Sequence, residues 1–284
     1  MKTSDFYVRD LLWAINSPPL MRFAEEESAS RSMALQAREI DGEHLKQWIE
    51  SDPERRVGRY FERLVLYWVR YVRGCEVIAQ AQQVIEGDRT VGEIDLVFRD
   101  EGGLVNHWEI AVKFYLHLAG ENTAEASFVG PNALDTLRRK RTRLIEHQLR
   151  LSVNRFPEVE VRHAFVRGRI FYYWRQLDQV VTSGELAPGH LTGRWLRSSE
   201  VIHAINDDQA KYRILEKPYW LAGQLMEQAD SHDLDASGCQ HKLEQHFSEK
   251  RQPVLLATFK REVSDGAESE RLFVVSDDWP AAHP

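Results

Sequence analysis

The stretch that decides the fold is VGEIDLVFRDEGGLVNHWEIAVKFYLH, from Val91 to His117. It contains two apolar runs joined by a short polar turn with two glycines, and this pattern predicts a β-hairpin. Three ionisable residues, Asp95, Glu109 and Lys113, lie inside these apolar runs. A charge in a buried strand is costly unless it has a partner or a function, so these residues are the first candidates for a site.

The spacing of the hairpin predicts which side chains face each other. Successive side chains alternate between the two faces of a strand, so Glu109 and Lys113 share a face of the second strand. A three-residue loop, Glu101 to Gly103, sets Asp95 opposite Glu109, whereas a five-residue loop sets Asp95 opposite Ala111. Both registers place the three charged side chains on one face of the hairpin.

The segments around the hairpin alternate between helical and strand patterns. An amphipathic helix is predicted from Val57 to Arg73, followed by a strand from Cys75 to Ile85. Pro131 is suited to the first turn of a long helix that is predicted to end before Pro157. Residues 159–174 are predicted to form two strands joined by a turn around Gly168. This order predicts a mixed α/β core.

The rest of the chain is expected to extend this core. Residues 1–56 are predicted to form an N-terminal helical arm, residues 57–175 the core, and residues 176–284 a C-terminal α+β extension packed on the core. The expected fold class is therefore α/β, a mixed sheet flanked by helices. A length of 284 residues is sufficient for one large domain or for a core with appendages.

The charge of the chain is unevenly distributed. The formal net charge is −7, which excludes a uniformly basic surface, yet residues 130–200 carry 13 Lys and Arg against 7 Asp and Glu. The basic cluster in this region consists of Arg138, Arg139, Lys140, Arg141 and Arg143. Such a run is usually a solvated helix face, but nucleic-acid phosphates would also neutralise it. Both interpretations remain open from the sequence.

The cysteines and the apolar runs indicate where the protein is expected to function. Cys75 and Cys239 lie far apart and have no metal-binding spacing, which favours a reducing compartment. The first residues contain no apolar signal-peptide segment, and no apolar run approaches the roughly 20 residues that a membrane helix needs. We therefore expect a cytoplasmic protein with no membrane partner. The sequence does not indicate an oligomeric state.

The run GEID at 92–95 and the run EIAVK at 109–113 together resemble the core of the PD-(D/E)XK nuclease superfamily, which has a restriction-endonuclease-like fold. That core carries an acidic residue on one strand, a (D/E)-x-K motif on the next, and often another acidic residue on the preceding helix. Longer segments, among them GRYFERLVLYW at 58–68 and RLFVVSDDWP at 271–280, resemble a bacterial family of unknown function that has been grouped with this superfamily. This second resemblance covers most of the chain.

The resemblance implies hydrolysis of phosphodiester bonds in DNA with Mg²⁺ or Mn²⁺ as the cofactor. It assigns Asp95 to the strand aspartate, Lys113 to the motif lysine and Glu62 to the helix glutamate. The implied catalytic residues are Asp95, Glu109 and Lys113, and the implied metal ligands are Asp95, Glu109 and Glu62. Mg²⁺ prefers such oxygen ligands, and a lysine can assist the attacking water. The basic cluster, Arg138 to Arg143, would bind the nucleic acid.

One position departs from the superfamily pattern. Ala111 stands two residues before Lys113, where the superfamily has Asp or Glu. Glu109 lies on the same face, about 6–7 Å further back along the strand. Either Glu109 replaces the missing acid, or the site has lost its metal and the chain is an inactive nuclease-fold module that binds nucleic acid or a protein partner. In a third interpretation, Asp95, Glu109 and Lys113 form only a structural ion-pair cluster.

Overall fold

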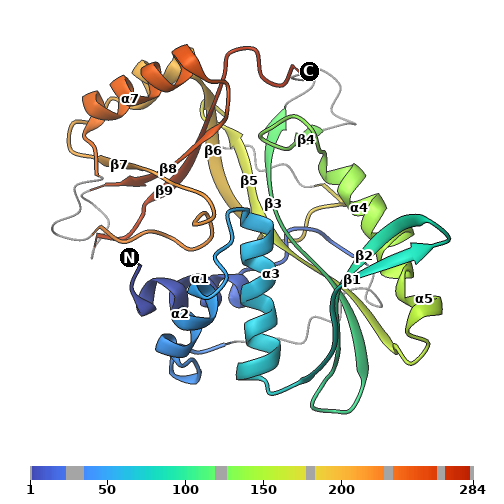
Figure 1. Ribbon diagram of the computed structural model, residues 1–284. Coiled ribbons are helices and arrows are strands. Elements are labelled where there is room, and N and C mark those ends of the chain that lie inside the picture. The colour runs from blue at the N-terminus through green and yellow to red at the C-terminus, as the bar shows by residue number, and fades with distance from the viewer. Residues whose placement is uncertain are drawn as a thin grey trace. The chain divides into compact units, whose positions relative to one another are not determined.

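The chain divides into two units, and the two longest strands of the sheet that cross this division contribute residues to both units. The computed structural model (Figure 1) describes residues 2–23, 35–118, 127–176, 183–226, 233–260 and 266–281. Unit 1 comprises Met1–Lys113, Arg138–Gly168 and Gly184–His190, and unit 2 comprises Phe114–Leu137, Arg169–Ser183 and Leu191–Pro284. The two units are interleaved along the chain, whereas the three predicted segments are consecutive, so that division stays a prediction.

The hydrogen-bonded order of the strands in the described residues is β1-β2-β3-β5-β6-β9-β8-β7, and β4 pairs with β3. The strands are β1 (Glu76–Glu86), β2 (Arg89–Arg99), β3 (Val105–Leu118), β4 (Ser127–Val129), β5 (Val161–Tyr173), β6 (Leu191–Arg197), β7 (Lys211–Ile214), β8 (Val254–Phe259) and β9 (Glu270–Val275). Strands β1, β2 and β3 pair in antiparallel fashion, whereas β5 pairs with β6 and β6 with β9 in parallel. The expected fold class, α/β with a mixed sheet and flanking helices, is confirmed.

Three helices of unit 1 lie side by side (Figure 1), namely α1 (Ser4–Asn16), α2 (Gly42–Glu50) and α3 (Val57–Tyr67). Helix α1 begins after Thr3, whose side chain accepts the backbone N–H of Phe6 and caps the helix. The hydroxyl of Tyr60 on α3 donates a hydrogen bond of 2.7 Å to the buried carboxylate of Asp10 on α1. A π-helical turn, Trp68–Val72, extends α3, and the chain then leaves the helix at Gly74, which has a φ of +67°.

The hairpin of β2 and β3 has the register predicted for the three-residue loop. Leu96 pairs with Trp108, and Val97 pairs with His107. The backbone N–H of Asp100 donates to the carbonyl of Leu104 and closes the loop. The described pairing ends at Leu96 and Trp108, so the register agrees with the shorter loop, while the pair Asp95 and Glu109 lies just beyond the paired residues.

The prediction of two strands within residues 159–174 is wrong, because β5 runs through this segment as one strand. Gly168 does not form a turn but has a φ of +152° within the strand. A Cβ at this position would lie 1.8 Å from the carbonyl oxygen of Lys113. The glycine is therefore required by a close approach of two backbones, a constraint that local sequence does not reveal.

The predicted long helix from Pro131 to Asn154 is also wrong, because it is divided into α4 (Leu137–Glu146), a 3₁₀ turn and α5 (Ser152–Arg155). The division lies at His147, where the ring nitrogen Nε2 is 2.9 Å from the carbonyl oxygen of Val91 on β2. Leu151 packs so closely on Gly92 that a Cβ there would lie 2.6 Å from the leucine side chain. Packing against β2 thus overrides the helical pattern.

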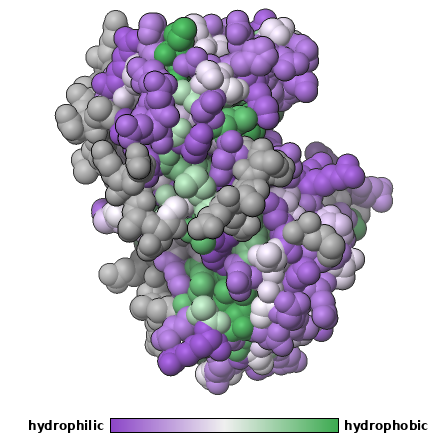
Figure 2. Space-filling view, turned by 90° about the vertical axis from the view of Figure 1, so that its left-hand side faces the viewer, coloured by the Kyte–Doolittle hydropathy of each residue, from purple (hydrophilic) through white to green (hydrophobic). Residues whose placement is uncertain are grey.

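Unit 2 has its own apolar core between the strands β7, β8 and β9 and helix α7 (Ala236–Glu249). Cys239 and Leu243 on α7 lie in this core with Leu256 and Val274. None of the described helices is both long and apolar enough to cross a membrane. On the face shown in Figure 2, hydrophilic residues are the most common, and apolar residues lie in smaller groups among them.

Candidate active site

The three predicted acidic residues lie in unit 1, with Glu62 on α3, Asp95 on β2 and Glu109 on β3. Glu62 and Asp95 are partly buried, and both line a pocket of about 250 Å³ that also contains Arg59 and Trp48. Glu109 does not line this pocket and is 0% exposed. The acidic site therefore has two carboxylates at a pocket wall and one in the protein interior.

Hydrogen bonds hold the buried carboxylate of Glu109 at both oxygens. Oε1 lies 2.9 Å from Nε2 of His107, and Oε2 accepts a hydrogen bond of 2.6 Å from the side-chain amide of Gln148. The other ring nitrogen of His107 lies 2.9 Å from Oγ of Ser152. Burial lowers the pKa of His107 to about 4, so this ring is neutral at pH 7.

The carboxylate of Asp95 interrupts the normal backbone pairing of the hairpin. Its Oδ2 accepts a hydrogen bond of 2.8 Å from the backbone N–H of Ile110. The side chain thus binds the strand that carries Glu109, and it occupies a backbone donor of that strand. This bond fixes the orientation of Asp95 at the pocket wall.

The pKa values of the three carboxyls are raised together. Burial raises the pKa of Glu109 to about 8, while the charge of Lys140 opposes this shift. Burial, followed by the charge of Glu109, raises the pKa of Asp95 to about 7. Burial, followed by the charge of Asp95, raises the pKa of Glu62 to about 7. The cluster thus favours bound protons or cations near neutral pH.

Lys140 is a member of this site that the sequence did not assign to it. Its Nζ donates a hydrogen bond of 2.9 Å to Gln148, the residue whose amide binds Glu109. Burial and the charge of Lys113 lower the pKa of Lys140, while Glu109 and Asp95 oppose this effect. Lys140 was expected on a nucleic-acid-binding face, whereas the structure places it beside the carboxylates.

The other members of the basic cluster lie elsewhere on α4. Arg138 is 3.4 Å from the carboxylate of Glu185, and Arg141 donates a hydrogen bond of 3.1 Å to the backbone carbonyl of Arg22. Arg139 and Arg143 are exposed. The cluster is thus divided between protein contacts and an exposed face.

Sequence reasoning also missed three residues of the pocket wall. Arg59 donates to the carboxylates of Glu62 and Glu93 at 2.8 and 2.9 Å, and these carboxylates raise its pKa. The guanidinium of Arg63 lies 5.0 Å from the ring centre of Trp48. The spacing of Arg59 and Glu62, three residues apart on a helix, was a signal for their ion pair.

The described residues contain no group of three or more His, Cys, Asp or Glu side chains that could hold a metal ion. The predicted ligands Glu62, Asp95 and Glu109 are therefore not assembled as a three-ligand centre. Mg²⁺ is also held by one or two carboxylates together with waters and substrate phosphates. Asp95 and Glu62 fit this simpler form, because both line the pocket and the charge of Asp95 raises the pKa of Glu62.

Comparison with known proteins assigns the chain to a family. No curated protein and no solved structure matches it. None of these comparisons relates the chain to the PD-(D/E)XK nucleases, so that part of the resemblance stays a proposal. Residues 9–275 match the family described as "Domain of unknown function (DUF1853)". Because this match spans most of the chain, the protein belongs to the DUF1853 family.

Proposed function

We propose that this protein is a nuclease-like enzyme with a restriction-endonuclease-like core, which hydrolyses phosphodiester bonds in DNA with Mg²⁺ or Mn²⁺. The observation that supports this proposal is the pair Asp95 and Glu62, two carboxyls with a pKa of about 7 at the wall of one pocket. Two carboxylates whose environments raise their pKa are typical of sites that bind cations or exchange protons.

Each residue has a distinct role in the proposed reaction. Asp95 and Glu62 would hold the cation, which supplies an activated water and positive charge for the phosphate when it is bound. Lys140 lies beside the carboxylates, where its charge acts on Glu109 and Asp95, and it would help to hold the negative charge of this site in place. Lys113 adds positive charge near the phosphate. Glu109 acts as a positioning residue, because it reaches Lys140 only through Gln148.

The pocket wall also contains groups that suit a nucleic acid. The ring of Trp48 offers a surface on which a base can stack, and Arg63 lies against that ring. Arg59 lies beside Glu62 and can attract a phosphate to the carboxylates. The exposed arginines of the basic cluster, Arg139 and Arg143, would add phosphate contacts.

A catalytically inactive module that binds nucleic acid or a protein partner is the second candidate. Three observations favour it. Ala111 occupies the position of the expected acid, Glu109 has both oxygens in hydrogen bonds, and Arg59 neutralises Glu62. Such a module would bind DNA in a salt-sensitive manner without cleaving it.

A cleavage assay separates the two candidates. Single-stranded and double-stranded DNA are incubated with wild type, Asp95→Ala and, as a control, Glu146→Gln, with Mg²⁺, Mn²⁺ or EDTA. We expect cleavage that depends on the metal and falls about 100-fold or more in Asp95→Ala, while the exposed control retains wild-type activity. Equal activity in wild type and Asp95→Ala would refute the enzyme. DNA binding without cleavage under any condition would support the inactive module.

A further inference from the structure

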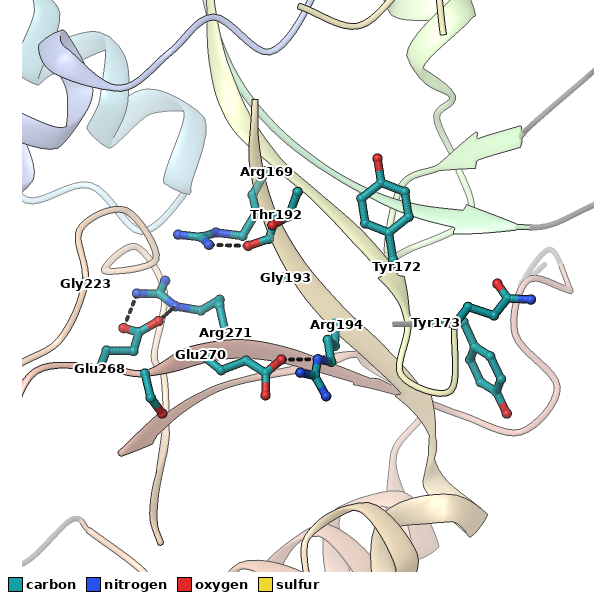
Figure 3. Close-up of a pocket in the computed structure, with 12 residues that line it drawn as sticks. Arg169, Tyr172, Tyr173, Thr192, Gly193, Arg194, Gly223, Glu268, Glu270 and Arg271 are labelled. Atoms are coloured by element: carbon teal, nitrogen blue, oxygen red, sulfur yellow. Dashed lines mark hydrogen bonds and ion pairs between the residues drawn. The ribbon is translucent and has the colours of Figure 1, made fainter. Parts of the chain in front are cut away.

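A cavity in unit 2 belongs to no part of the acidic site. It has a volume of about 390 Å³ and is lined by side chains of β5, β6 and β9 and of the segments beside them (Figure 3). Cavities of this volume lie in the range of small-molecule sites. Three arginines and two glutamates line it, namely Arg169, Arg194, Arg271, Glu268 and Glu270.

Two of the three arginines have carboxylate partners. Arg271 is 1% exposed and binds the carboxylate of Glu268 through two nitrogens, at 2.5 and 2.6 Å. Its Nη1 and Nη2 also donate to the backbone carbonyls of Trp220 and Ala222, both at 2.8 Å. Arg194 forms an ion pair with Glu270. The charges of these two arginines are therefore compensated within the cavity wall.

Arg169 differs from the other two arginines. Its guanidinium donates a hydrogen bond to the backbone carbonyl of Thr192, and it has no carboxylate partner within ion-pair distance in the part of the chain that the structure describes. Figure 3 shows the guanidinium groups of Arg169 and Arg271 pointing to the same side of the strands. Burial and the charge of Arg271 lower the pKa of Arg169 to about 10, while the charge of Glu268 opposes this shift. With three arginines and two glutamates in its lining, the cavity wall thus carries a net charge of +1.

We propose that this cavity binds a small organic anion whose phosphate or carboxylate group pairs with Arg169. Arg169 is partly exposed and has no carboxylate partner among the described residues, and a guanidinium matches the two oxygens of such a group in a planar, bidentate geometry. Tyr173, Thr192 and Ser269 also line the cavity and offer aromatic and polar groups to the rest of the ligand. This proposal does not depend on the function of the acidic site.

Isothermal titration calorimetry at constant ionic strength tests this assignment with inorganic phosphate and with acetate as separate probes. We expect saturable binding of at least one probe to wild type, and a loss of affinity of about 10-fold or more in Arg169→Met. The control Arg251→Met, at an exposed arginine paired with Asp278, should bind as wild type does. Binding of phosphate alone assigns a phosphate group to the ligand, and binding of acetate alone assigns a carboxylate.

A second variant keeps the test decisive where Arg169→Met does not fold. Gly223 lines the cavity, and a Cβ at this position would meet no atom within 4 Å. Gly223→Glu therefore adds a negative charge to the wall without a backbone clash, and we expect it to weaken binding of the same probe about 10-fold or more. Absence of saturable binding to wild type, or wild-type affinity in either variant, would overturn the proposal.

Discussion

Replacement of Glu109 by Gln should remove a large part of the pH dependence of the stability of this protein. The carboxyl is 0% exposed and lies between Nε2 of His107 and the side-chain amide of Gln148. In Glu109→Gln, the new amide can donate to His107 while its oxygen still accepts from Gln148. The variant therefore keeps both hydrogen bonds and mimics the protonated carboxyl.

The size of this effect follows from the pKa of Glu109, which burial raises from 4.5 to about 8. Between pH 6 and pH 8 the unfolded carboxyl is ionised, whereas the folded one is almost fully protonated at pH 6 and about half protonated at pH 8. The folded state thus binds more protons, and its stability falls as the pH rises through this window. One proton changes the free energy of unfolding by about 1.4 kcal/mol per pH unit, so Glu109 accounts for a loss of about 2 kcal/mol between pH 6 and pH 8.

Urea unfolding of wild type, Glu109→Gln and the exposed control Glu146→Gln at pH 6, 7 and 8 measures this effect. Wild type and the control should lose stability as the pH rises, and the loss in Glu109→Gln should be smaller by about 2 kcal/mol. The reasoning fails if all three proteins show the same pH dependence. That result would mean that the pKa of Glu109 in the folded state stays close to its ordinary value.

Other perturbations test neighbouring features of unit 1. Gly168→Ala should destabilise the protein by about 3 kcal/mol in urea unfolding, because the new Cβ meets a backbone carbonyl of β3, whereas Gly184→Ala should change stability by less than about 0.5 kcal/mol. Mg²⁺ should raise the Tm more at pH 8 than at pH 6, since the carboxyl of Asp95, with a pKa of about 7, must lose its proton to bind it, and Asp95→Asn should abolish this difference. Lys140→Met should raise the pKa of Glu109 further, as measured by carboxyl ¹³C NMR, because the charge of Lys140 opposes the shift caused by burial.

The hairpin could be predicted from the sequence because its determinants are local. The length of the loop was sufficient to predict the register, in which Leu96 pairs with Trp108. An element whose pattern and boundaries depend on residues nearby in the sequence can therefore be predicted well.

Elements that depend on distant contacts could not be predicted in this way. Gly168 looks like a turn residue in the sequence, but it serves a close approach to the backbone at Lys113. The helical pattern after Pro131 is interrupted where His147 and Leu151 pack on β2. In both cases the tertiary contact determines the local structure, and the pattern alone favours the wrong alternative.

The sequence identified residues of the candidate site but not the hydrogen bonds that connect them. Charged residues in apolar strands led to Asp95 and Glu109, and the helix glutamate led to Glu62. The sequence did not reveal that Gln148 links Glu109 to Lys140, because these residues lie on segments that meet only in the folded protein. The hydrogen bonds that hold Glu109 in the interior likewise arise from tertiary packing.

The central claim is that the pocket of Asp95 and Glu62 is a cation centre and not a purely structural cluster. The most direct test is an anomalous difference map from crystals soaked in Mn²⁺ at pH 8, where both carboxyls are ionised. We predict one strong peak within about 2.0–2.4 Å of carboxylate oxygens of both residues. A map without a peak in this pocket, with both carboxylates well ordered, would contradict the claim and favour the inactive module.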